Sequence, residues 1–157
     1  MKVSLTSMIF LMASCIYPAA YAEQSTEFCD VLRSFVGSVN PNETKEFVFR
    51  TSWGSNFNDT PEIVLFAKRC EHSDYPAAKN VCSYLMEHAS AEFAAIAVIN
   101  AISCLSPGSN FGNQLTINSG SFSISYGTPD RGSLVDITFS EDSTVGGMAF
   151  KLVADGY

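Results

Sequence analysis

The chain has 157 residues, of which 46% are hydrophobic, and its 16 acidic and 9 basic side chains give a formal net charge of −7. So large an excess of carboxylates disfavours nucleic acids and anionic membrane surfaces as partners, because both are negatively charged. The charge favours instead a protein partner with a basic surface. After residue 22 the apolar runs are well below the ~20 residues that a membrane-spanning helix needs, so we expect no membrane insertion of the mature protein.

The first 22 residues have the three parts of a secretory signal peptide. Lys2 provides the positive charge, residues 3–14 form a short apolar core, and Ala20-Tyr21-Ala22 has the small residues of a cleavage site. We therefore expect cleavage after this site, a single mature domain over 23–157, and export to the periplasm or the extracellular space. The alternative is a lipid anchor at Cys15.

The first half of the mature chain has the patterns of several helices and one strand. Apolar residues three and four positions apart predict an amphipathic helix over 23–39, and alternation over 46–51 predicts a strand. A Thr-Pro pair at its start predicts a second helix over 60–70. Two further helices are predicted, one over 76–86 and one over 91–105, which is apolar nearly all round and is therefore expected at the centre of the fold.

From residue 113 the period of the apolar residues changes to two, which predicts four successive strands around 115–117, 122–126, 135–139 and 148–152. Residues typical of tight turns separate them, so we expect an antiparallel meander. The helices are available to cover its apolar face. The predicted fold is α+β: a helical N-terminal half with one early strand, packed on a C-terminal antiparallel meander of about four strands and held by two disulfides.

Four cysteines follow the predicted leader, and four thiols admit three pairings. Cys70 and Cys82 fall near facing ends of two predicted helices, which favours a Cys70–Cys82 bond and leaves Cys29 for Cys104. Disulfides persist outside the cytosol. The alternative is a metal site with two cysteine and two histidine ligands: Cys70, His72, Cys82 and His88. Its spacing matches no standard zinc finger, so we predict disulfides, no metal and no cofactor.

The run from Cys70-Glu71 to Cys82-Ser83-Tyr84 resembles the helical cysteine pairs of periplasmic immunity proteins, which protect bacteria from cell-wall amidase toxins. The resemblance covers about fifteen residues. Those immunity proteins are mainly helical, whereas the C-terminal half of this chain has the pattern of a sheet. The resemblance is confined to this run and does not assign the chain to that family.

The sequence contains no recognised catalytic motif. It has no Gly-x-Ser-x-Gly elbow, no phosphate-binding glycine loop and no His-Glu-x-x-His pair. A cysteine protease would need a reduced thiol near His88, which is unfavourable in an oxidising compartment. The Glu141-Asp142 pair is interpreted as part of a solvated hairpin turn, and the two histidines, His72 and His88, are interpreted as caps at helix C-termini.

One loop concentrates aromatic and amide side chains, which anchor protein interfaces and stack on sugars. Its candidate binding residues are Trp53, Asn56, Phe57 and Asn58. We therefore expect an exported, non-enzymatic binding protein, most simply a periplasmic inhibitor or immunity protein for an enzyme with a basic surface. The alternative is a small secreted hydrolase of cell-wall or carbohydrate material, with Trp53 as sugar platform and Glu62 or Glu71 as acid and base. The sequence leaves the oligomeric state open.

Overall fold

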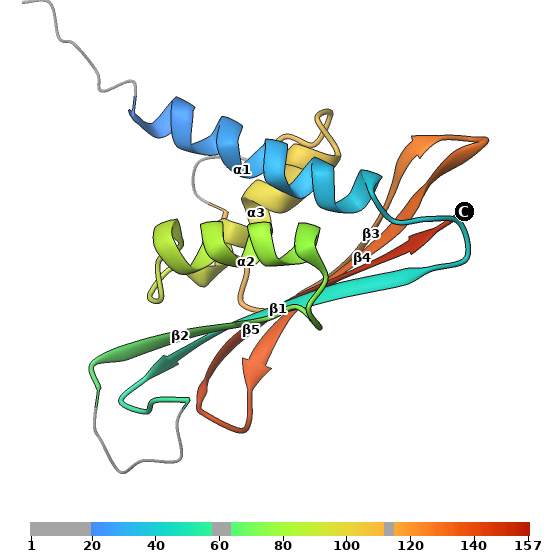
Figure 1. Ribbon diagram of the computed structural model, residues 1–157. Helices are drawn as coiled ribbons and strands as arrows, with labels where there is room; N and C mark the ends of the chain where they lie inside the picture. The colour runs from blue at the N-terminus through green and yellow to red at the C-terminus, as the bar shows by residue number, and fades with distance from the viewer. Residues whose placement is uncertain (1–19, 58–63, 112–114) are drawn as a thin grey trace, which may run out of the picture.

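The computed structural model describes residues 20–57, 64–111 and 115–157. In these residues, helices lie against one face of a five-stranded antiparallel sheet (Figure 1). The helices are α1 (Ala20–Gly37), α2 (Pro76–His88) and α3 (Ala94–Leu105). The strands are β1 (Thr44–Trp53), β2 (Phe66–Glu71), β3 (Gly120–Thr128), β4 (Arg131–Asp142) and β5 (Gly147–Gly156). Their order in the sheet is β2-β1-β5-β4-β3, so the predicted α+β class is confirmed.

Helix α1 buries one stripe of large apolar side chains in the core. They recur at spacings of three and four residues, as in a helix with one buried face: Phe28, Leu32, Phe35 and Val36. The predicted helix over 23–39 is confirmed, with a start at Ala20 and an end at Gly37. The helix thus runs through the predicted cleavage site.

Helices α2 and α3 follow each other closely in the chain, and the sequence predicts the start of α2 better than the start of α3. Helix α2 begins at Pro76, as predicted, because proline is tolerated in a first helical turn. Helix α3 begins at Ala94, three residues later than predicted, after a turn in which the Phe93 N–H donates to Ser90 Oγ (3.2 Å). The expected place at the centre of the fold holds only for the buried side of α3, since Ile96 is 54% exposed.

The sheet has one apolar face and one polar face, because side chains alternate along each strand. Phe47 pairs with Leu152 and Phe49 with Phe150, and all four side chains are fully buried beneath the helices. The predicted meander is confirmed as β3-β4-β5, and the early strand joins it as β1 beside β5. No helix of the described residues lies on the opposite face of the sheet (Figure 1); we call it the back face.

Two predicted elements are wrong. Phe66–Glu71 forms strand β2 rather than the end of a helix over 60–70, because pairing with β1 outweighs the local helical spacing. Residues 58–63 lie outside the described residues. Residues 115–117 form no strand; their side chains lie beside α3. The C-terminal half therefore contributes three strands, and β1 and β2 complete the sheet.

Two disulfides connect the layers, Cys29–Cys104 between α1 and α3 and Cys70–Cys82 between β2 and α2. The pairs are those favoured by the sequence, although Cys70 lies on a strand, so its bond joins sheet to helix and not two helices. His88 does lie in the last turn of α2. The expectation of a helix C-terminus at His72 is wrong, because His72 directly follows β2.

Candidate binding surface

An aromatic pair lies at the end of the β1–β2 strand pair from which the connecting loop leaves. Trp53, the last residue of β1, pairs in register with Phe66, the first residue of β2, and the two side chains are 47% and 53% exposed. Leu65, the neighbour of Phe66, is 77% exposed. We call Trp53, Leu65 and Phe66 the aromatic tip. The chain leaves Trp53 through Gly54, whose positive φ of 72° suits glycine and whose N–H donates to Leu65 O (3.3 Å).

Trp53 and Phe66 of the aromatic tip lie on the same face of the sheet as the helices. Side chains alternate along a strand, so Phe66, Lys68 and Cys70 share one face of β2. Cys70 is bonded to Cys82 of α2, and Lys68 Nζ donates to Ala89 O at the C-cap of α2 (2.9 Å). Phe66 therefore extends this face just beyond the turn that joins α2 to α3.

The other predicted binding residues lie elsewhere. Ser55, Asn56 and Phe57 line a cleft of about 470 Å³ with side chains of the back face, including Arg50 and Asp142. Trp53 is absent from this lining. The predicted loop is therefore divided between the two faces, and Asn58 lies outside the described residues.

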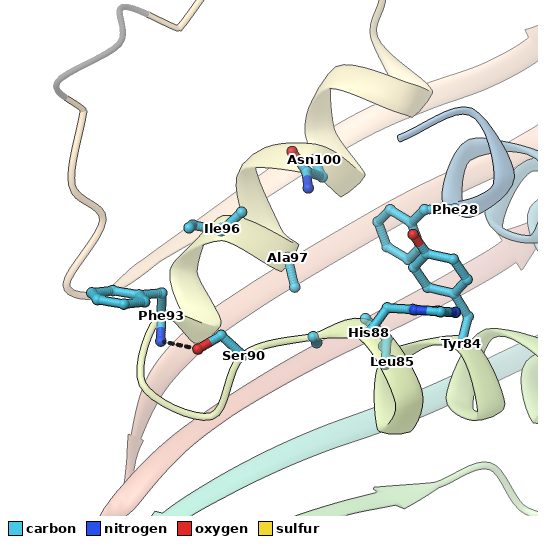
Figure 2. Close-up of a pocket in the computed structure, with 10 residues that line it drawn as sticks. Phe28, Tyr84, Leu85, His88, Ser90, Phe93, Ile96, Ala97 and Asn100 are labelled. Atoms are coloured by element: carbon cyan, nitrogen blue, oxygen red, sulfur yellow. Dashed lines mark hydrogen bonds between the residues drawn. The ribbon is translucent and has the colours of Figure 1, made fainter. Parts of the chain in front are cut away.

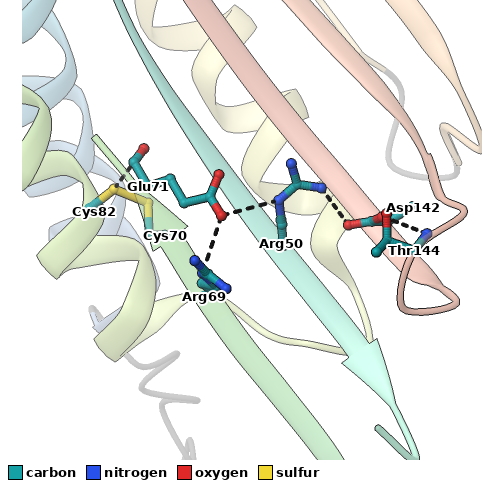
Figure 3. Close-up of polar contacts among 7 residues, drawn as sticks. All are labelled: Arg50, Arg69, Cys70, Glu71, Cys82, Asp142 and Thr144. Carbon is teal, nitrogen blue, oxygen red and sulfur yellow. Dashed lines mark hydrogen bonds and ion pairs between the residues drawn. A yellow bond between two sulfur atoms is a disulfide. The ribbon is translucent and has the colours of Figure 1, made fainter. Parts of the chain in front are cut away.

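A network of charges forms the floor of this cleft (Figure 3). Arg50 pairs with Asp142 and places its Nε 3.7 Å from Glu71 Oε1, while Arg69 Nε lies 3.1 Å from the same oxygen. Asp142 Oδ1 also accepts the Thr144 N–H at 3.0 Å. The interpretation of Asp142 as a solvated turn residue is wrong, because it ends β4 with its side chain buried.

The ionisation of this network follows from its contacts. Burial by itself would raise the pKa of Asp142, but the hydrogen bonds and charge of Arg50, with the Thr144 N–H, outweigh burial and hold that pKa below its usual value. The hydrogen bond to Asp142 likewise raises the pKa of Arg50. Glu71 faces two guanidinium groups. Asp142 and Glu71 are thus each paired with guanidinium groups, and they do not face each other as the acid and the base of a hydrolase would. Glu62 lies outside the described residues.

Helix α3 has a groove on each side of its exposed residues. Phe93 and Ile96, 57% and 54% exposed, line both grooves, and we call this pair the α3 ridge. The first groove, of about 300 Å³, lies among the three helices. Figure 2 shows its two walls: one from α1 and α2 with Phe28, Tyr84 and His88, the other from α3 with Ile96, Ala97 and Asn100.

The wall from α1 and α2 is built of packed rings. Phe28 stacks on Tyr84 with ring centroids 5.2 Å apart, and His88 lies tilted against Tyr84 at 4.6 Å. Burial, with a smaller effect from the charge of Glu27, raises the pKa of the Tyr84 phenol. The Tyr84 phenol therefore stays neutral at physiological pH, and the wall is largely apolar.

The second groove, of about 450 Å³, lies between α3 and residues 115–118 above Phe139 and Met148. Glu92 lines it beside the ridge, and Glu87 lies 3.9 Å from His88 Nε2 at the first groove. The lining of the two grooves contains no lysine or arginine in the part of the chain that the structure describes. The ridge is therefore apolar with carboxylates nearby. Phe93 and Ile96 belong to the apolar segment for which the sequence predicts a central helix, so their exposure could not be predicted from that pattern.

The described residues hold no group of three or more histidine, cysteine or acidic side chains placed to bind a metal. The alternative four-ligand site is contradicted, because Cys70 and Cys82 are bonded to each other. Likewise, none of the helices in the described segments has the length and apolar character needed to cross a membrane.

Comparisons with models of protein families, with curated proteins and with solved structures found no match to this chain.

Proposed function

We propose that this protein is an exported, non-enzymatic binding protein that inhibits an enzyme with a basic surface, and that the aromatic tip and the α3 ridge contact that enzyme. The observation that supports this best is the exposed Trp53–Phe66 pair at the end of two paired strands. Aromatic side chains held on a rigid element lose little conformational freedom on binding and dominate the energy of many interfaces.

The charge of the surface supports a basic partner. Removal of Lys2 with the leader would leave 8 basic and 16 acidic side chains, a net charge of −8. Glu87 and Glu92 lie at the grooves beside the ridge, where the described lining has no cationic side chain other than a histidine. A basic partner would be attracted at long range and would then pack against the aromatic tip and the α3 ridge.

The disulfides support export. Two bonds join helices and sheet, and such bonds persist in oxidising compartments such as the periplasm or the extracellular space. The hydrolase hypothesis has less support, because Glu71 is engaged by Arg50 and Arg69 and Trp53 does not line the cleft that contains Glu71.

Capture followed by inhibition tests the proposal. Mature protein is immobilised, exposed to periplasmic extract of its host, and each captured enzyme is purified and assayed with and without added protein. We expect one captured enzyme with a basic surface to lose activity, with an association rate that falls as salt rises. If no enzyme is inhibited, or the purified protein itself hydrolyses cell-wall glycan, the proposal is wrong.

Variants then locate the contact. The exchanges Trp53→Ala and Phe66→Ala, made together, should weaken inhibition roughly 30-fold or more, since a buried aromatic anchor contributes about 2 kcal/mol. Leu134→Ala is the matched control, because Leu134 is also exposed and apolar but lies on the back face of β4. Equal affinities of both variants would exclude the aromatic tip from the interface.

A further inference from the structure

The two edges of the sheet differ in their protection against pairing with another strand. Edge strand β2 has six residues, carries Lys68 and Arg69, and is tied to α2 through Cys70. Edge strand β3 has nine residues, Gly120–Thr128, with no charged residue and no proline. Natural edge strands are usually short, charged, interrupted or covered, because their unpaired N–H and C=O groups are a template for another chain. By these criteria β2 is protected and β3 is not.

Strand β3 is also regular. It pairs with β4 residue for residue from Gly120 and Phe139 to Thr128 and Arg131, without a bulge. In the part of the chain that the structure describes, β4 is the only strand that pairs with β3. Its other side is therefore a row of backbone groups that no other strand of the described sheet pairs with.

We propose that two copies of this protein associate through their β3 edges, antiparallel and centred on Ile124, to form one continuous ten-stranded sheet. A two-fold axis at Ile124 places Phe122 of one copy opposite Tyr126 of the other, and Ser123 opposite Ser125. Such an interface is self-complementary, as a two-fold dimer requires. This inference is independent of the proposed inhibitor function.

The side chains of β3 suit this pairing on both faces of the sheet. Phe122, Ile124 and Tyr126 lie on the core face and are only partly buried in one copy. In the dimer each would gain a cross-strand aromatic or aliphatic neighbour and lose contact with water. The serines between them are exposed on the back face. They are uncharged, so no like charges would face each other across the dimer interface. Strand β2 suits such pairing less well, because a two-fold axis at Lys68 or at Arg69, in the middle of the strand, would set that cation against the same cation of the other copy.

The net charge of the molecule determines how dimerisation depends on salt concentration. Two copies with a formal charge of −8 each after loss of Lys2 repel each other at long range, and added salt screens this repulsion. Dimerisation should therefore strengthen as salt rises, whereas association with a basic enzyme should weaken. The two opposite trends distinguish the dimer from the proposed inhibitor complex.

Analytical ultracentrifugation of the mature protein over a concentration series, at low and high salt, tests the dimer. We expect a monomer–dimer equilibrium that shifts toward dimer in high salt. The double exchange S123K/S125K places lysine opposite lysine across the axis and should raise the dissociation constant at least tenfold. The exchange S123K/S125E places lysine opposite glutamate and should restore the dimer.

Two controls keep the result interpretable. Ser140→Lys adds one positive charge to the same face of β4, away from the β3 edge, and should leave the dimer unchanged. Circular dichroism of every variant checks the fold, since Ser123 also hydrogen-bonds Asp136 within the chain. A protein that stays monomeric at every concentration, or a dimer that S123K/S125K leaves intact, would overturn the proposal. So would a monomer whose β3 edge instead receives a strand of another protein.

Discussion

Arg50 of β1 reaches across strand β5 to pair with Asp142 at the end of β4, on the back face of the sheet. Two small residues on the intervening strand leave room for the guanidinium, since Ala149 pairs with Arg50 and Gly147 pairs with Asp142. The ion pair therefore joins two strands that share no backbone hydrogen bonds, at the end of the sheet that carries the aromatic tip.

Loss of the Asp142 charge should destabilise the fold. Asp142→Asn removes the charge of a buried carboxylate and leaves Arg50 with only the more distant Glu71 as a charged partner, so we expect a loss of about 2 kcal/mol in the free energy of unfolding. Urea denaturation measures it. Glu141→Gln is the matched control, because Glu141 is exposed beside Asp142, and it should change stability by less than about 0.5 kcal/mol. Equal effects of the two exchanges would mean that the ion pair contributes nothing.

The same pair predicts the direction of acid destabilisation. Contacts with Arg50 and Thr144 hold the pKa of Asp142 below its unfolded value, so the folded state favours the ionised carboxylate. This contribution is fully present above the unfolded pKa of about 3.9 and is lost as the pH falls through the lower folded pKa. Wild-type protein should therefore lose more stability than Asp142→Asn when the pH falls from about 5 to 2. Parallel stability curves for the two proteins would contradict this.

The two disulfides should differ in their contribution to stability. Cys29–Cys104 spans 75 residues and Cys70–Cys82 spans 12. In the chain-entropy treatment a longer closed loop restricts the unfolded state more, by about 4.5 kcal/mol for the first bond and about 3 kcal/mol for the second. Replacing Cys29 and Cys104 with alanine should therefore lower the denaturation midpoint more than replacing Cys70 and Cys82. The reverse order would show that local packing dominates over loop length.

Gly147 should not accept a side chain. A Cβ at this position, the first residue of β5, would lie 1.7 Å from the backbone oxygen of Thr51, and both backbones are held by strand pairing. Gly147→Ala should cost about 3 kcal/mol or prevent folding. Gly108→Ala is the control, because nothing lies within 4 Å of the added methyl group. Thermal unfolding of both variants measures the difference, and similar melting temperatures would be inconsistent with this packing.

Cleavage of the leader should occur after Ala22. The apolar segment and the small residues at Ala20 and Ala22 agree on this site. Intact-mass analysis of the exported protein should give a chain that begins at Glu23. A chain that begins at a lipidated Cys15 would overturn the predicted cleavage site and favour the lipid anchor.

Elements whose signals are local could be predicted from the amino-acid sequence alone. Pro76 marks the start of α2, apolar spacing marks α1, and alternation marks β3 to β5, because each pattern depends only on neighbouring residues. The even number of cysteines after the predicted leader and the short separation of Cys70 and Cys82 favour the observed pairing. The sequence predicts Trp53 as a binding residue in a loop; it is exposed, but it is the last residue of β1.

Features that depend on distant residues could not be predicted from local patterns. Helical spacing before Cys70 gives way to a strand because β1 pairs with this segment from Phe66 to Glu71. Asp142 is buried because Arg50, 92 residues earlier in the chain, neutralises it. Trp53 gains Phe66 as its neighbour through strand register, and Phe93 and Ile96 stay exposed because no element of the described chain covers that side of α3. Local periodicity states that a side chain is apolar, but burial depends on what the rest of the chain places against it.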